Sequence, residues 1–273
     1  MNAFRHLLKA AGSQPPIGTW ILSASALVAE AVGHAGFDWG VVDMEHSPLD
    51  MREVVQLLQA IGNTRMVPVV RVPWNDAVAV KRVLDAGATT VMIPFVQNAA
   101  EAEHAVAATR YPPDGVRGMV GMSRATRYGT RPDHARHANR EMGVIVQLET
   151  PAALDQIDAI VAVPGVDALF VGPADLSAAM GHVGQPMHPA VMERMARAAR
   201  RAAEHGMPIG TVGGDAGAVV QYRALGYDFV ALSADLGLLM QGSQDALQSL
   251  RNPRPEAHVH TLADGTVTGQ NGS

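Results

Sequence analysis

The sequence predicts a single α/β domain built as a (β/α)8 barrel, the TIM-barrel architecture, over residues 1–251, followed by a polar, mobile tail at 252–273. Three observations predict this fold. Short apolar runs alternate with helical patterns along the chain, and eight such pairs suit roughly 250 residues. Gly and Pro recur between them, with 27 Gly and 17 Pro in all. An apolar fraction of 48% supplies side chains for a large core.

The apolar runs have the length and composition of buried parallel strands. They lie at residues 17–20, 38–43, 67–70, 90–94, 143–148, 167–171, 208–212 and 228–232. The helical patterns between them occupy residues 26–35, 49–61, 76–86, 99–109, 151–161, 188–205, 216–225 and 236–250.

Glycines mark the ends of several predicted helices. Gly36, Gly87 and Gly226 each follow a helical pattern directly, where a left-handed residue can turn the chain into the next strand. One long connection, residues 111–141, interrupts the rhythm and is rich in Arg, His and Gly. A connection of this length predicts a lid or an oligomer contact.

The composition excludes several classes of protein. A formal charge of −5 argues against general binding to nucleic acid or to anionic membranes. The chain has no Cys, which excludes disulfides, thiolate metal sites and a Cys nucleophile and fits a reducing compartment. No stretch has the length of a signal peptide core or a membrane span. We therefore expect a cytoplasmic protein.

Two carboxylates stand at the ends of predicted strands. Glu149 follows the run 143–148, and Asp175 lies just after the run 167–171. Ligands bind at the C-terminal ends of barrel strands, and carboxylates with water suit a hard divalent cation. The pair predicts a metal site. Either residue could instead cap a helix, since helical patterns begin at Pro151 and near Leu176.

Other side chains gather at the same predicted rim. Gln147 and Glu149 lie two residues apart on an extended segment, so both face one side and can reach one ligand. Arg71 ends the third apolar run and must pair with an anion if it is buried, either a rim carboxylate or a carboxylate or enolate oxygen of the substrate. His46 is either a base or an exposed loop histidine. Trp20 ends the first run.

Asp85 opposes the dipole at a predicted helix end, so its position needs a reason. The plain explanation is an ion pair with Lys81 or Arg82, and the sharper one is that Asp85 orients a catalytic His. Lys81 and Lys9 are the only lysines in the chain, and neither follows a strand. The positions of both lysines therefore argue against Schiff-base chemistry at this rim.

Several ordered motifs resemble the HpcH/HpaI aldolase family, metal-dependent pyruvate-specific aldolases related to 4-hydroxy-2-oxoheptanedioate aldolase. The resemblance runs from Ile17 to about Leu250. The motifs are Gly18-Thr19-Trp20, Asp43-Met44-Glu45-His46-Ser47-Pro48, Val70-Arg71-Val72-Pro73, Asp85-Ala86-Gly87-Ala88, Tyr111-Pro112-Pro113-Asp114-Gly115-Val116-Arg117-Gly118, Gln147-Leu148-Glu149-Thr150 and Val171-Gly172-Pro173-Ala174-Asp175-Leu176-Ser177.

The resemblance implies a (β/α)8 barrel that assembles as a hexamer, a trimer of dimers. It implies Mg²⁺, Mn²⁺ or Co²⁺ held by Glu149 and Asp175. His46 resembles the base or water-positioning residue, Asp85 the acid that raises its basicity, and Arg71 the transition-state stabiliser. The implied substrate-binding residues are Trp20, Gln147, Gly172, Pro173, Ala174 and Asp175.

The resulting hypothesis is a reversible retro-aldol cleavage of 4-hydroxy-2-oxo acids to pyruvate and an aldehyde, through a metal-stabilised pyruvate enolate. Oxaloacetate decarboxylation would pass through the same enolate and stays open as an alternative. A carbon–carbon lyase acting on CoA thioesters and a non-catalytic metal- or ligand-binding barrel are further alternatives.

Overall fold

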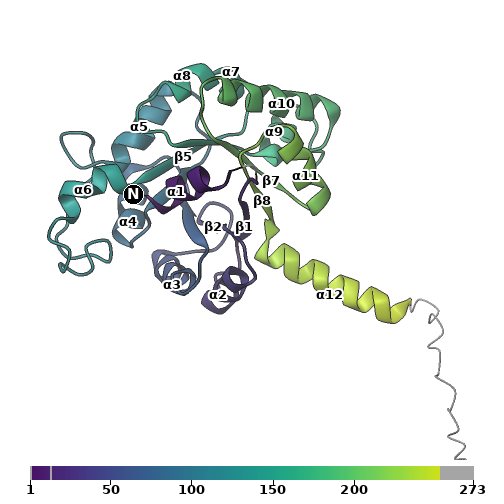
Figure 1. Ribbon diagram of the computed structural model, residues 1–273, viewed down its shortest axis with the longest axis horizontal. Coiled ribbons are helices and arrows are strands. Elements are labelled where there is room, and N and C mark those ends of the chain that lie inside the picture. The colour runs from purple at the N-terminus through teal and green to yellow at the C-terminus, as the bar shows by residue number, and fades with distance from the viewer. Residues whose placement is uncertain (1, 13, 253–273) are drawn as a thin grey trace, which may run out of the picture. The chain divides into compact units, whose positions relative to one another are not determined.

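The computed structural model describes residues 2–12 and 14–252. Eight parallel strands close into one barrel in chain order, with the last strand paired to the first, which confirms the predicted fold (Figure 1). The strands are β1 (Ile17–Ile21), β2 (Trp39–Asp43), β3 (Val67–Arg71), β4 (Thr90–Ile93), β5 (Gly143–Leu148), β6 (Ala168–Val171), β7 (Ile209–Gly213) and β8 (Phe229–Ala234).

Helices alternate with the strands along the chain, as the sequence predicts (Figure 1). They are α1 (Ala3–Ala10), α2 (Ala26–His34), α3 (Met51–Ile61), α4 (Ala77–Asp85), α5 (Ala99–Thr109), α6 (His134–Glu141), α7 (Pro151–Asp155), α8 (Ile157–Val161), α9 (Pro173–Ala179), α10 (Pro189–Glu204), α11 (Ala216–Ala224) and α12 (Asp235–Arg251).

Several helices differ from the predicted ranges, among them α9, which lies between the predicted helices at 151–161 and 188–205. The single helix expected at 151–161 is broken into α7 and α8 at Gln156, whose φ of −99° and ψ of 6° lie outside the helical range. The helix α6 lies inside the long connection at 111–141, and α1 precedes the first strand. The predicted helix-ending glycines are confirmed, because Gly36, Gly87 and Gly226 all have φ near +100°.

Aromatic side chains fill one end of the barrel. Phe4, Trp39, Phe170 and Phe229 are at most 1% exposed, and their rings meet edge-on or tilted at 5.3–6.4 Å. Phe4 belongs to α1, so this helix contributes a core side chain. Gly18 and Gly210 leave the space that the rings of Trp39 and Phe229 occupy. The first short helix is therefore part of the barrel's packing.

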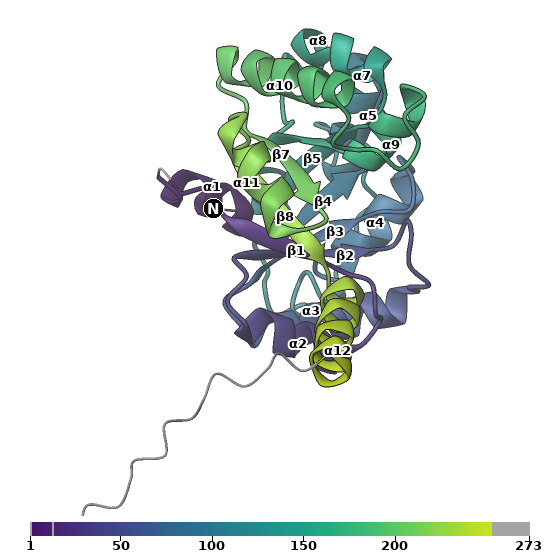
Figure 2. The same cartoon turned by 90° about the vertical axis from the view of Figure 1, so that its right-hand side faces the viewer.

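The two ends of the barrel carry different residues. Figure 2 shows α1 and α9 at opposite ends, α1 on the left and α9 on the right. The α1 end holds the starts of the strands, because the side-chain amide of Asn2 donates to Thr89 O at 2.8 Å, directly before β4. The strands end beside α9, where ligands bind in such barrels.

Residues through Gly237 form one compact unit, and a second unit begins at Leu238. The described part of the second unit consists mainly of the rest of the helix α12, which begins at Asp235. The boundary predicted at residue 251 stays a prediction, and all but one residue of the predicted tail at 252–273 lie outside the described residues. Within the described ranges, no helix is both long and apolar enough to cross a membrane.

Candidate active site

A buried arginine occupies the centre of the strand ends. Arg71 is the last residue of β3 and is 5% exposed. Its Nε donates to Asp43 Oδ1 at 2.8 Å and its Nη2 to Asp43 Oδ2 at 2.6 Å. Asp43 is the last residue of β2 and the register partner of Arg71, so the strand pairing itself aligns the two side chains. The predicted salt bridge to a rim carboxylate is confirmed.

Several charges hold Arg71 in its protonated form. Burial alone would lower its pKa, but the hydrogen bond and charge of Asp43, with Glu45 and Glu149 nearby, raise the pKa above its usual value. Arg71 Nη1 lies 2.8 Å from Glu45 Oε2, and the guanidinium stacks over the Trp20 ring at 4.8 Å. This guanidinium is fixed on three sides, as a residue that orients a bound anion requires.

His46 lies at the open edge of this cluster. Its side chain is 64% exposed, and its Nε2 is 3.9 Å from Glu45 Oε2. The backbone N–H of Glu45 donates to Asp43 Oδ1 at 3.0 Å, and the Ser47 hydroxyl donates to Asp43 O, so the turn after β2 is tied to its aspartate. Burial raises the pKa of Glu45, partly offset by Arg71 and His46. The imidazole therefore borders the site and is accessible to a substrate.

Glu149 is held by two donors. The Gln147 amide nitrogen donates to its Oε1 at 2.7 Å, and the backbone N–H of Phe95 donates to its Oε2 at 3.0 Å. Glu149 is 2% exposed, and the predicted sharing of a face by Gln147 and Glu149 is borne out by their contact. Thr150 caps α7, with its side chain accepting from Ala153 N, so the capping alternative for Glu149 is wrong.

Burial raises the pKa of Glu149 to about 8, and the negative charges of Asp175 and Glu45 add to this effect. Arg71 and the Phe95 N–H act in the opposite direction and lower it. The carboxylates of Glu149, Asp175 and Glu45 thus lie near one another, and the Arg71 guanidinium does not fully compensate their negative charge. A bound cation would supply the missing positive charge.

Asp175 lies on the exposed first turn of α9, and its charge acts on both Glu149 and Glu45. Gly172 caps this helix, and a Cβ at Gly172 would lie 2.7 Å from Glu149 Oε1. Pro173 is buried and Ala174 is exposed beside Asp175. The structure therefore brings the segment from Gly172 to Asp175 to Glu149, as the sequence predicts for a shared site.

The site fits a hard divalent cation that also takes ligands from water and substrate. Among residues 2–12 and 14–252, no group of three or more His, Cys, Asp or Glu side chains forms a complete ligand set. Mg²⁺ is commonly held by one or two carboxylates and keeps several waters. Glu149, with its raised pKa, and Asp175 supply two such oxygens, so these residues fit the group.

Asp85 lies away from the other predicted site residues. It is the last residue of α4, which runs back from the end of β3 toward the start of β4, so it stands at the opposite end of the barrel from His46. Its Oδ1 accepts from Arg117 Nη2 at 2.9 Å. An ion pair with Lys81 or Arg82 is therefore not its explanation. The chain does not bring Asp85 to its own His46.

Sequence reasoning missed the role of Phe95. The residue has φ of +54°, and its backbone N–H binds Glu149. Its ring stacks on Trp74 with centroids 5.9 Å apart. A left-handed phenylalanine leaves no signal in a sequence, because this conformation normally favours Gly or Asn. Asp43 and Glu45 belong to the motif from Asp43 to Pro48, and the strand register explains why Asp43 meets Arg71.

Comparisons with known proteins identify the family of this chain. The family model for HpcH/HpaI aldolase/citrate lyase matches residues 16–242. The chain belongs to this family.

A 2-dehydro-3,6-dideoxy-6-sulfogluconate aldolase of Pseudomonas putida is 48% identical over 89% of this chain and 95% of that protein. A pyruvate aldolase of Rhizobium etli is 45% identical over 89% and 95%. The solved structure of an HpcH/HpaI family protein from Burkholderia cenocepacia superposes with a TM-score of 0.89 at 43% identity, covering 92% of this chain and all of that one. The prediction of an enzyme of an aldolase family is thereby confirmed.

Proposed function

We propose that this protein is a divalent-metal-dependent aldolase that cleaves 4-hydroxy-2-oxo acids reversibly to pyruvate and an aldehyde. The observation that carries the proposal is the buried constellation of Arg71, Gln147 and Glu149 at the strand ends. Relatives at 45% and 48% identity that are named as aldolases support it. The aldehyde portion of the substrate lies beyond this proposal.

Glu149 and Asp175 would hold Mg²⁺, Mn²⁺ or Co²⁺. The cation, when bound, supplies Lewis-acid polarisation of the 2-oxo acid. Arg71 would face the oxygen on which negative charge develops, an interaction that becomes stronger as the reaction proceeds. Asp43 accepts hydrogen bonds from two nitrogens of this guanidinium, so the guanidinium is already ordered before the substrate binds. Trp20, Gln147 and the segment from Gly172 to Ala174 would enclose the pyruvate portion.

His46 would move the proton. In the cleavage direction its neutral imidazole takes the 4-hydroxyl proton, directly or through a water, while the C3–C4 bond breaks. The electron pair of that bond passes to the pyruvate fragment, whose C3 later takes a proton. The exposure of His46 leaves room for an aldehyde to enter and leave on that side.

The proposed role of Asp85 requires a second subunit. Asp85 stands at the far end of its own barrel, so only the Asp85 of another copy could adjust the basicity of His46. We therefore include a homo-oligomer, a hexamer built from dimers, in the proposal. Asp85 is about one quarter exposed and is fixed by Arg117, so it could present its free oxygen to a neighbouring subunit.

Exchange of deuterium into the pyruvate methyl group, followed by NMR, tests the proposal without knowledge of the aldehyde. We expect exchange with Mg²⁺ or Mn²⁺, none after chelation, and a loss of at least 100-fold in Arg71→Ala. Arg52→Ala, an exposed arginine on α3, is the control and should exchange normally. A folded wild-type protein that exchanges no methyl protons with any divalent ion would refute the pyruvate assignment.

A further inference from the structure

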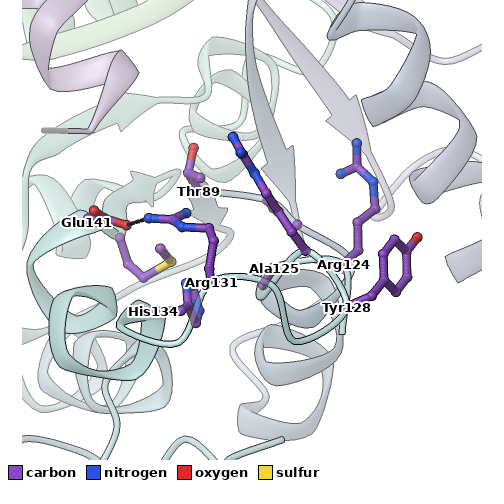
Figure 3. A pocket seen from close by; sticks show the side chains of 11 residues that line it. Thr89, Arg124, Ala125, Tyr128, Arg131, His134 and Glu141 are labelled. Atoms are coloured by element: carbon purple, nitrogen blue, oxygen red, sulfur yellow. Dashed lines mark hydrogen bonds and ion pairs between the residues drawn. The ribbon is translucent and has the colours of Figure 1, made fainter. Parts of the chain in front are cut away.

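A second polar cavity lies at the opposite end of the barrel from the candidate active site. It has a volume of about 360 Å³ and lies between the segment before β4, the segment before β5 and the long connection. Figure 3 shows Arg131, His134 and Glu141 on one side of it and Arg124 and Tyr128 on the other. The volume is that of a site for a small molecule.

Two buried nitrogens without hydrogen-bond partners in the described ranges belong to His134, which lines this cavity. Among the described residues, six buried side-chain nitrogen or oxygen atoms lack a hydrogen-bond partner, and four of them belong to His134 and Arg117. His134 lines the cavity and is 5% exposed, and Arg117 is 1% exposed. Because native proteins rarely leave such groups unsatisfied, the unpaired imidazole of His134 in the cavity wall indicates a partner inside the cavity, whereas Arg117 does not line the wall.

The wall of the cavity is positively charged. Arg124, Arg127 and Arg131 line it, whereas Glu141 is its only carboxylate among the described residues. Glu141 lies 3.4 Å from Arg131, which leaves the other two arginines uncompensated by it. Arg124 Nη1 donates to Ala86 O at 3.0 Å and so is held in place. Arg127 makes no ion pair within the described part of the chain.

The buried histidine is suited to donate a hydrogen bond to an anion. Burial lowers the pKa of His134, and the charges of Arg117 and Arg131 lower it further, with Glu141 and Asp85 acting weakly in the other direction. A neutral imidazole still carries one N–H donor. The arginine side chains attract an anion by their charge, and the imidazole N–H adds a hydrogen bond that orients the anion.

We propose that this cavity is a binding site for a small oxyanion with about two negative charges, of the phosphate or short dicarboxylate class. Arg127 and Arg131 supply the charge, and His134 supplies a neutral donor. Arg127 and Tyr128, which both line the cavity, have left-handed backbones, with φ of +49° and +55°. The site lies at the opposite end of the barrel from the strand ends of its own chain, and anion binding there does not require the proposed reaction.

Isothermal titration of the full-length, chelator-treated protein with inorganic phosphate, and separately with malonate, tests the proposal at constant ionic strength. We expect saturable binding of at least one of them, with one site per chain. Arg127→Gln should weaken it at least 10-fold, and His134→Leu should weaken it similarly. The control is Arg136→Gln on α6, an arginine whose side chain is 82% exposed and lies outside the cavity wall, which should bind as the wild type does.

Two results would overturn the proposal. The first is the absence of saturable binding of both anions, which would leave the cavity to water or to a residue of another copy. The second is binding that Arg127→Gln and His134→Leu leave unchanged, which would place the anion elsewhere, for example at Arg71. Loss of folding does not obscure the test, because Arg127 has no ion pair to lose and Leu replaces an unsatisfied imidazole with an apolar group.

Discussion

At Glu149, burial and neighbouring charge make the protein's stability depend on pH. The pKa is raised from the usual 4.5 to about 8, so between these values the folded carboxyl keeps a proton that the unfolded chain has lost. The free energy of unfolding should therefore fall as pH rises through this window, by up to roughly 5 kcal/mol, and then level off. Urea unfolding of the metal-free protein at a series of pH values from roughly 5 to 9 measures this effect.

Two variants distinguish the contribution of Glu149 to this pH dependence from the contributions of other carboxyl groups. Glu149→Gln should be the more stable protein near pH 8 and should show a flatter dependence on pH. The exposed Glu103→Gln on α5 should keep the wild-type slope. Saturation with Mn²⁺ should also flatten the slope in the wild type, because the bound cation replaces the proton. An unchanged slope in Glu149→Gln would show that another group causes the dependence.

Gly172 is the residue whose replacement should disturb the metal ligand most directly. A Cβ there would lie 2.7 Å from Glu149 Oε1 and 2.9 Å from its Cγ, so the carboxylate must shift. Gly172→Ala should weaken Mn²⁺ binding about 10-fold, the lower end of the effect seen when groups that orient ligands are changed. Gly214→Ala has open space around it and is the matched control. Equal Mn²⁺ affinity in both variants would remove Glu149 from the ligand set.

At the scale of single elements, the strands were predictable and several helices were not. All eight strand ranges agree with the structure within two residues, because buried parallel strands are short apolar runs between Gly and Pro. The break at Gln156 was not predictable from a continuous helical pattern. The position of α1 depends on contacts with distant residues, such as the pairing of Arg5 with Asp167 at 2.6 Å.

The same distinction explains the site. Arg71 ends β3, Gln147 lies near the end of β5 and Glu149 follows β5, so the barrel topology alone brings them together. Phe95 acts through a backbone conformation, and Arg117 reaches Asp85 from the long connection, 32 residues later. Neither relation has a local pattern in the sequence.

The helix α1 should contribute substantially to stability through one side chain. Phe4 is 1% exposed and packs edge-on against Phe229 at 5.3 Å and Trp39 at 6.0 Å. Phe4→Ala should lower the free energy of unfolding by about 3–5 kcal/mol, as for other buried aromatic side chains. His6→Ala on the exposed face of the same helix should change it by less than about 0.5 kcal/mol. Similar losses in both variants, measured by urea unfolding, would contradict the packing argument.

For the whole molecule, the separation of His46 from Asp85 decides how many chains make one site. The two residues belong to opposite ends of the barrel, since one follows β2 and the other ends a helix that returns to the start of β4. Within one chain the pair cannot meet without unfolding the barrel. The proposed reaction therefore either proceeds without Asp85 or takes it from a second copy.

Mixing two inactive variants distinguishes these possibilities. If sites are shared, an oligomer assembled from His46→Ala and Asp85→Ala chains contains sites in which an intact His46 meets an intact Asp85 of its neighbour. Random pairing of equal amounts makes about a quarter of the sites complete, so methyl exchange of pyruvate should recover to about a quarter of the wild-type rate after joint refolding. Mixing His46→Ala with Arg71→Ala is the control, because both residues lie at the strand ends of the same barrel, after β2 and at the end of β3, and no site regains both. Recovery in neither mixture, with Asp85→Ala inactive alone, would mean that Asp85 acts within its own chain by stabilising the segment around Arg117 rather than by serving a neighbour's His46.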